Sequence, residues 1–249
     1  MRIGIIETGR PPETLREPHG GYPDMFVDLL KAEDPTLEFT SYAAVDGTVP
    51  KDPHECDAWL ITGSRHGVYE RLPWMAELAE LIRKSFAERV PVVGICFGHQ
   101  IMADALGGKV VKSQKGWGLG LHRYEIGRKP DWMADAPASF TIPAVHQDQV
   151  IEVPEGADVL ASSEFCANAA IAYDDVGFSV QGHPEFTEDY QRDLYEERLK
   201  PIVPASVIEG ALKSFDETRN SAPTVAQWIV RFLKRKRGTK SAAAQAAAE

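Results

Sequence analysis

The stretch Arg89-Val-Pro-Val-Val-Gly-Ile-Cys-Phe-Gly-His-Gln-Ile-Met-Ala-Asp-Ala-Leu-Gly-Gly108 decides the fold of this chain. Its first part, residues 90–95, is an apolar run rich in β-branched residues, which is typical of a strand buried on both faces of a parallel sheet. After Cys96 the apolar residues recur at helical spacing, and Gly107-Gly108 then ends the predicted helix. Cys96 is therefore predicted to lie at a strand-to-helix junction.

That junction is Gly94-Ile-Cys-Phe-Gly98, a cysteine version of the nucleophile elbow. A sulfur at a helix N-terminus lies near the positive end of the helix dipole, which favours the thiolate. The N–H of Phe97 is then a candidate donor to an oxyanion. The alternative is that Cys96 is a small buried apolar residue. Because the sequence gives no packing reason for Gly94 and Gly98, it favours the nucleophile.

Length, net charge and cysteine content limit the classes of protein to which this chain can belong. A chain of 249 residues fits one α/β domain with some length left over, and its net charge of −10 argues against a nucleic-acid partner. No segment is long and apolar enough to span a membrane, and the N-terminus leads directly into a predicted strand without a cleavable signal. Cys56, Cys96 and Cys166 cannot all pair and have no metal-ligand spacing. These features predict a cytoplasmic protein without a metal.

The first half of the chain alternates strands and helices, which predicts an open, mostly parallel sheet of flavodoxin-like type with flanking helices. A loop is expected at residues 9–21 because prolines and glycines crowd it. Predicted strands cover residues 2–8, 37–42, 56–62 and 90–95, and predicted helices cover residues 23–31 and 74–88.

After Gly108 short strands with turn residues between them predict an antiparallel extension, with a polar loop at residues 143–150. The glycines at 116, 118 and 120 fit either a hairpin turn or a close backbone approach. Helices are predicted at residues 187–199, 205–215 and 224–233. The predicted organisation is therefore a domain at 1–200, a helical extension at 201–238 and a disordered tail at 239–249, with a basic cluster at 234–240.

A histidine and a carboxylate follow the predicted strand at 177–181. His183 and Glu185 lie two residues apart, so in an extended chain their side chains face the same side. Pro184 between them stiffens the backbone. In a chain that already has an activated cysteine, His183 is a candidate general base and Glu185 the group that orients it.

These motifs together resemble the class I glutamine amidotransferases, especially the glutaminase domain of GMP synthase and its stand-alone relatives. The resemblance covers roughly residues 1–190. It is carried by the motifs Gly-Ile-Cys-Phe-Gly-His-Gln at 94–100, Val-His-Gln-Asp-Gln-Val at 145–150 and Gln-Gly-His-Pro-Glu-Phe at 181–186.

The resemblance implies a role for each matching residue. Cys96 would be the nucleophile, His183 the acid and base, and Glu185 its partner. The oxyanion donors would be the main-chain N–H groups of Phe97 and Ser64, where Ser64 stands at a position that the family fills with glycine and would need a glycine-like backbone. The substrate contacts implied are Gly63, Gln100, His146, Gln147 and Asp148.

Three functions follow from the sequence. The first is a glutaminase that passes ammonia to a separate acceptor enzyme, because residues 201–249 are too short for a synthetase and lack a phosphate-binding loop. The second is a free-standing γ-glutamyl peptidase or amidase, with the loop at 9–21 and Arg65-His66 deciding the leaving group. The third is a binding module on the same fold. The expected small molecule is glutamine or a γ-glutamyl compound, and no cofactor is expected.

Overall fold

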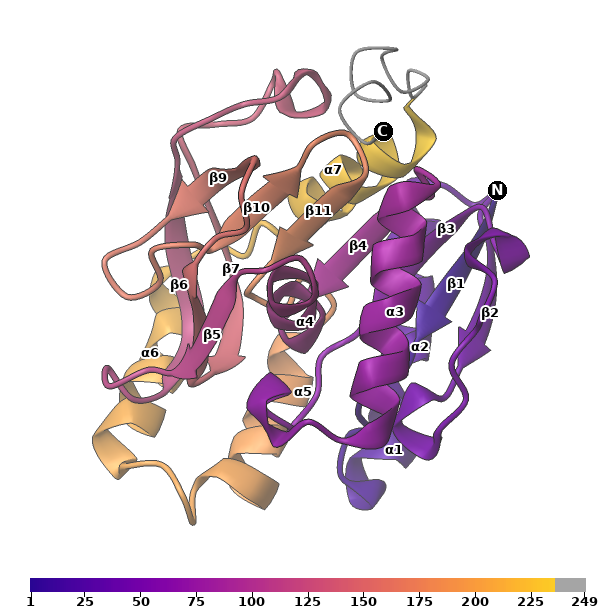
Figure 1. Ribbon diagram of the computed structural model, residues 1–249. Helices are drawn as coiled ribbons and strands as arrows, with labels where there is room; N and C mark the ends of the chain where they lie inside the picture. The colour runs from indigo at the N-terminus through magenta and orange to yellow at the C-terminus, as the bar shows by residue number, and fades with distance from the viewer. Residues whose placement is uncertain (236–249) are drawn as a thin grey trace.

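The computed structural model describes residues 1–235 of the chain (Figure 1). The strands are β1 (Arg2–Ile6), β2 (Glu38–Tyr42), β3 (Ala58–Ile61), β4 (Val92–Ile95), β5 (Lys109–Lys112), β6 (Gly118–Ile126), β7 (Ser139–His146), β8 (Asp148–Glu152), β9 (Ala157–Ser162), β10 (Ala170–Tyr173) and β11 (Gly177–Val180). The helices are α1 (Glu13–His19), α2 (Tyr22–Glu33), α3 (Pro73–Ala87), α4 (Phe97–Ala105), α5 (Glu188–Leu194), α6 (Ala205–Glu217) and α7 (Ala222–Lys234). A π-helix, Tyr195–Leu199, follows α5 directly.

The main sheet has nine strands in the order β2-β1-β3-β4-β11-β10-β9-β6-β7. The first five of these strands are parallel, and the remaining pairs are antiparallel. The parallel part has the flavodoxin-type order, so the predicted fold class is confirmed, including its antiparallel extension. Strands β5 and β8 form a separate antiparallel pair.

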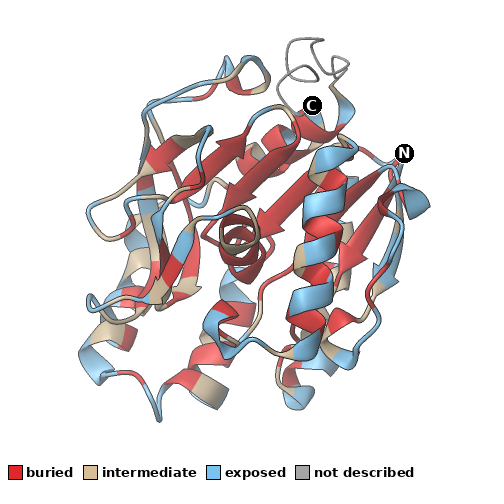
Figure 2. Ribbon diagram, viewed as in Figure 1, coloured by how far each residue is buried: buried red, intermediate tan, exposed pale blue. Residues whose placement is uncertain are grey.

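Helices cover both faces of the sheet, and each face has its own hydrophobic core (Figures 1 and 2). On one face α2 and α7 contribute Phe26 and Trp228 to a core that also contains Ile3, Leu60 and Ile95. On the other face α3 and α4 bury their apolar sides, which Figure 2 shows as one buried side of α3 and an almost wholly buried α4. The parallel strands are thus buried on both faces, as their continuous apolar sequence predicts.

The segment after β11 packs beside the antiparallel end of the sheet. Helix α6 lies so close to β6 that a Cβ atom on Gly120, which has φ +84°, would be 2.7 Å from the Cα atom of Ala211. The N–H of Gly120 donates to the hydroxyl of Tyr195 in the π-helix at 2.9 Å. Gly116, in contrast, lies at a turn with open space around it. Both interpretations of these glycines therefore apply, each at a different position.

Two predicted loops are wrong. Residues 13–19 of the expected loop 9–21 form α1, because Leu15 packs into a cluster with Tyr190 and Leu194, and Thr14 donates to Glu197 at 2.6 Å. These contacts outweigh the weak local propensity of a proline-rich stretch. The expected loop 143–150 is mostly strand, since β7 continues to His146 and β8 begins at Asp148. Pro143 is tolerated there because β7 is an edge strand.

The predicted helix at 187–199 is divided into α5 and the π-helix, whereas the helices predicted at 205–215 and 224–233 correspond to α6 and α7. The predicted tail at 239–249 and most of the basic cluster at 234–240 lie outside the described residues. Within residues 1–235, none of the helices combines the length and the apolar character that crossing a bilayer requires.

Candidate active site

The carboxyl ends of neighbouring parallel strands bring the predicted site residues to one edge of the sheet. Gly63 follows β3, Cys96 follows β4 and His183 follows β11, and these three strands are adjacent in the order β3-β4-β11. All three residues line one cleft of about 320 Å³. This is the position at which open α/β sheets place their ligands.

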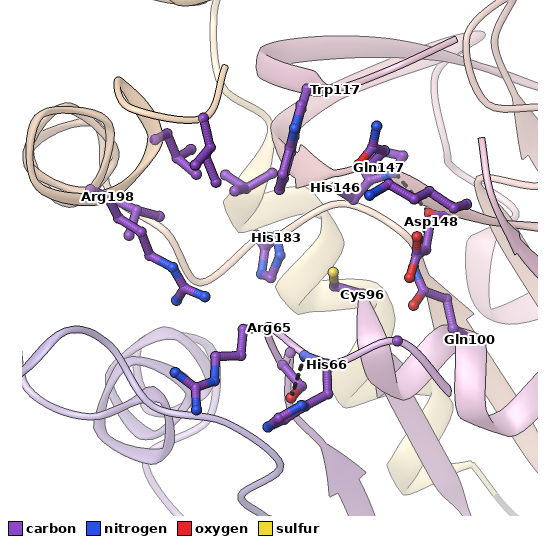
Figure 3. Close-up of a pocket in the computed structure, with 18 of the residues that line it drawn as sticks. Arg65, His66, Cys96, Gln100, Trp117, His146, Gln147, Asp148, His183 and Arg198 are labelled. Carbon is purple, nitrogen blue, oxygen red and sulfur yellow. Dashed lines mark hydrogen bonds between the residues drawn. The ribbon is translucent and has the colours of Figure 1, made fainter. Parts of the chain in front are cut away.

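Cys96 has the backbone of a nucleophile elbow. Its φ of 53° and ψ of −101° are conformations that a residue with a side chain rarely adopts, and it is the N-cap of α4. The N–H of Cys96 donates to the carbonyl of Val180 at 2.9 Å, which attaches the elbow to the end of β11. The side chain is 5% exposed and faces the cleft beside His183 (Figure 3).

Gly94 and Gly98 have a packing reason that the sequence did not reveal. A Cβ atom on Gly94 would lie 2.5 Å from the backbone of Gly98, and one on Gly98 would lie 2.3 Å from the carbonyl oxygen of Ile61. The N–H of Gly98 donates to the carbonyl of Thr62 at 3.2 Å. The two glycines therefore allow α4 to begin directly against β3 and β4, which is what aims Cys96 into the cleft.

His183 and Glu185 form a buried pair. Nδ1 of His183 and Oε1 of Glu185 are 2.7 Å apart, and both residues are at most 5% exposed. The ring of Phe186 stacks on the imidazole with centroids 4.0 Å apart and an interplanar angle of 5°. The N–H of His183 donates to the carbonyl of Pro143 at 2.7 Å, which attaches this turn to β7. The imidazole is thus fixed from its ring face, its Nδ1 atom and its backbone.

The charge of this pair is determined by its neighbours. Burial lowers the pKa of His183, but the carboxylate of Glu185 and the adjacent Cys96 outweigh that effect and raise it to about 10. The imidazolium is therefore the main form at neutral pH.

The segment after β3 presents its backbone to the same space. A Cβ atom on Gly63 would lie 2.7 Å from Cε1 of His183, so a side chain at this position would collide with the imidazole. Buried Thr8 at the end of β1 holds the segment, since its hydroxyl bonds to the carbonyls of Thr62 and Gly63 at 2.9 and 3.1 Å. Phe97 is the first residue of α4, so its N–H lacks an acceptor within the helix.

The glycine-like backbone expected at Ser64 is not found. Among the described residues, positive φ at non-glycine positions occurs at Arg71, Arg89, Cys96 and Asp174. Ser64 lines the cleft with an ordinary φ, and its hydroxyl accepts from the N–H of His66 at 3.2 Å. A serine is accommodated here because the loop turns without entering the left-handed region.

The remaining predicted contacts lie across Cys96 from His183 (Figure 3). Nε2 of Gln100 donates to the carbonyl of Asp148 at 3.0 Å, and His146 and Gln147 line the same wall. Burial raises the pKa of the Asp148 carboxyl, and the hydroxyl of Tyr69 donates to it at 3.2 Å. Burial also lowers the pKa of His146 to about 3, so this histidine is neutral. Eight of the predicted site residues therefore line one cleft, namely Gly63, Ser64, Cys96, Gln100, His146, Gln147, Asp148 and His183.

Sequence reasoning missed several residues of the cleft. Phe186 belongs to a quoted motif, but its stacking on His183 depends on the turn at Pro184 and is not a periodic signal. Arg198 reaches the cleft from the π-helix, and Tyr22 and Trp117 reach it from the start of α2 and the loop before β6. These positions come from segments far from the motifs, so only the tertiary structure identifies them.

Comparisons with known proteins agree with this geometry. The family model for glutamine amidotransferase class-I matches residues 40–199. A solved structure of a glutamine amidotransferase from Thermotoga maritima superimposes with a TM-score of 0.72 at 20% identity, covering 94% of this chain and 99% of that one. This likeness concerns the fold.

Two curated relatives differ in how much of their length the chain covers. Gamma-glutamyl peptidase 3 of Arabidopsis thaliana is 31% identical over 214 residues, which is 83% of this chain and 85% of the relative. The glutamine-hydrolysing GMP synthase of Bacillus subtilis is 36% identical over 138 residues, which is 54% of this chain but only 26% of the synthase. The chain therefore matches the peptidase over most of both lengths and the synthase over one part.

Proposed function

Because this chain belongs to the class I glutamine amidotransferase family and is a cysteine hydrolase of that type, we propose that it hydrolyses the γ-amide bond of γ-glutamyl compounds. The catalytic groups would be Cys96, His183 and Glu185. The observation that carries the proposal is the buried His183–Glu185 pair, 2.7 Å apart, beside a cysteine in a strained elbow.

The chemistry would proceed in two steps. The Cys96 thiolate attacks the γ-carbonyl carbon, and the N–H groups of Phe97 and Ser64 stabilise the oxyanion; loss of one such donor costs about 3 kcal/mol. His183 gives its proton to the departing nitrogen, so the C–N bond breaks and a γ-glutamyl thioester remains. His183 then takes a proton from water, and the resulting hydroxide attacks the thioester carbon. The C–S bond breaks, which releases glutamate and the Cys96 thiolate.

The substrate would lie with its γ-carbonyl at Cys96 and its two ends on opposite sides. Gln100 and Asp148 are placed to hold the α-amino acid end, because the amide oxygen and the carboxylate can accept from its ammonium group. The leaving group then faces His183 and the open end of the cleft. A cleft of about 320 Å³ that continues beyond His183 suits a leaving group larger than ammonia.

The test is hydrolysis by the purified chain, measured as released glutamate and amine. We expect turnover of γ-glutamyl dipeptides, a trapped γ-glutamyl adduct on Cys96 by mass spectrometry, and loss of both in Cys96→Ala with an unchanged melting temperature. Cys56→Ala, which removes another buried thiol, is the matched control and should stay active. Full activity in Cys96→Ala contradicts the mechanism.

Glutamine hydrolysis with transfer of ammonia to a separate acceptor enzyme is the second candidate. It is favoured by the 36% identity to the part of GMP synthase that the chain matches. Glutamine turnover that exceeds dipeptide turnover, and that rises when an acceptor chain is added, would select this function over the first.

A further inference from the structure

A second cavity continues the cleft on the side of His183. It measures about 480 Å³ and shares three lining residues with the cleft, namely Arg65, His66 and Arg198. Its far wall comes from residues 9–16, the segment that leads into α1. A leaving group that extends past His183 would therefore pass these shared residues first.

Arg65 and Arg198 differ from the other arginines of this region in having no ion-pair partner among residues 1–235. Within residues 1–235, no carboxylate lies within ion-pair distance of either guanidinium. Arg10 in the same cavity pairs with Glu7 and Asp46, and Arg16 donates to the carbonyl of Pro11. Glu70 interacts with Arg65 through charge, but neither guanidinium is held in an ion pair, so both are available to bind an anion.

Two of the carboxylates near these arginines, Glu70 and Glu197, are engaged with other groups. Glu70 accepts from Gly67 at 2.8 Å and is 2.7 Å from Nδ1 of His66. Glu197 accepts from the hydroxyl of Thr14 at 2.6 Å, which fixes α1 to the π-helix. Glu13, which also lines the second cavity, belongs to the first turn of α1. The wall that the two cavities share, formed by Arg65, His66 and Arg198, therefore keeps a positive character despite the acidic residues around it.

The π-helix explains how Arg198 reaches the cleft. A π-helix is rare and often occurs at functional sites. Here it follows α5 without a break and places Arg198 half-buried with Leu199 in the cleft lining, while Tyr195 anchors it to Gly120. Figure 3 shows Arg198 and Arg65 on opposite sides of the cleft mouth, away from Gln100 and Asp148. The two guanidinium groups thus lie on the side where the leaving group departs.

We propose that Arg65 and Arg198 bind the terminal carboxylate of the leaving amino acid or peptide, so that the preferred substrates are γ-glutamyl peptides with a free C-terminus. This inference rests on the proposed γ-glutamyl hydrolase function. Guanidinium groups match carboxylates in charge and geometry. Glutamine and γ-glutamyl derivatives of neutral amines lack this carboxylate and would leave both arginines without a ligand.

The test compares kcat/KM for γ-glutamyl-alanine with kcat/KM for its C-terminal amide. We expect the wild type to prefer the acid by about tenfold or more, the effect of one charge-assisted contact. In Arg198→Gln and in Arg65→Gln this acid-to-amide ratio should fall towards one. Arg123→Gln removes the same charge from an exposed ion pair with Glu125, outside both cavities, and should leave the ratio unchanged.

Binding measurements test the carboxylate subsite independently of the proposed hydrolase function. In the Cys96→Ala background, calorimetry should show that γ-glutamyl-alanine binds more tightly than its amide, and that Arg198→Gln removes the difference. Tighter binding of the acid without wild-type turnover would support the carboxylate subsite and reject the hydrolase. Equal binding of acid and amide, or an acid-to-amide ratio that the arginine variants leave unchanged, overturns the subsite.

Discussion

Single residues show where a sequence pattern is sufficient to predict local geometry and where it is not. Cys96 is identifiable because the elbow surrounds it with glycines, and the structure gives it the positive φ that such a turn needs. Ser64 shows the opposite, since a family pattern predicts a glycine-like backbone that this loop does not adopt. Phe186 could not be identified as a support for His183, because ring stacking depends on the path of the turn. Local geometry is thus predictable when it depends on neighbours in the chain.

The raised pKa of His183 predicts a pH dependence. The leaving nitrogen needs a proton from the imidazolium, so kcat/KM for γ-glutamyl substrates should fall as pH rises through about 10. Glu185→Gln removes the carboxylate that stabilises the imidazolium, so the pKa falls and this alkaline limb should move down by about 1–3 pH units.

Pre-steady-state or kcat/KM profiles across pH 6–11 measure this limb. Glu188→Gln, which removes an exposed carboxylate paired with Arg192, is the matched control and should leave the limb in place. An alkaline limb that is identical in Glu185→Gln and in the wild type would contradict the assignment of the limb to His183.

Helices and strands were predictable where their apolar pattern is continuous. The pattern correctly places α3 and β4, whose residues face a core on one or both sides. Helix α1 and the π-helix could not be predicted, because they depend on contacts distant in sequence. Thr14 joins α1 to Glu197 of the π-helix, and Leu15 packs against Tyr190 and Leu194 of α5. Strand β7 was underestimated because Pro143 suggests a break, which an edge strand tolerates.

The close contact between β6 and α6 predicts different costs for two similar substitutions. Gly116 and Gly120 both have positive φ, so alanine costs about 1 kcal/mol of strain at either position. At Gly120 the new Cβ also meets the backbone of Ala211, which adds about 1–3 kcal/mol of overpacking. Urea denaturation should therefore show a larger loss of unfolding free energy for Gly120→Ala than for Gly116→Ala. Equal losses would mean that α6 moves aside freely.

At the scale of the whole molecule, the order of the sheet was predictable in class but not in detail. The βαβ pattern predicts a parallel sheet, yet it does not predict that β11, the last strand within residues 1–235, inserts beside β4. That neighbourhood brings His183 to Cys96, and it depends on contacts between distant parts of the chain. The site was predictable as a set of residues because family motifs mark them, and the sequence also pointed to Arg65. Arg198 was not predictable, because it reaches the cleft from the distant π-helix.

Buried neutral histidines predict a loss of stability in acid. Burial lowers the pKa of His99 and of His146 to about 3, and it lowers the pKa of His122. Below about pH 6.5 the unfolded chain binds protons that the folded chain does not, so stability falls as pH falls from about 6.5 towards 3.

The slope should be about 1 kcal/mol per pH unit for each fully buried histidine. Urea midpoints at pH 7, 6 and 5 measure it. His99→Gln should reduce the slope, whereas His54→Gln, at an exposed histidine paired with Glu88, should not. A slope that survives in both variants would assign acid sensitivity to other groups.

The late position of β11 in the sequence has a consequence for folding during synthesis. Synthesis delivers the elbow and its thiol early, but the strand that carries His183 emerges only after the whole antiparallel extension. Until that strand fills the place between β4 and β10, Cys96 lacks both the imidazole of His183, its proposed proton donor, and the wall opposite Gly63. A ribosome-bound fragment that ends before β11 would thus carry the Cys96 thiol without its imidazole neighbour. Hydrolytic activity would begin only when β11 completes the sheet.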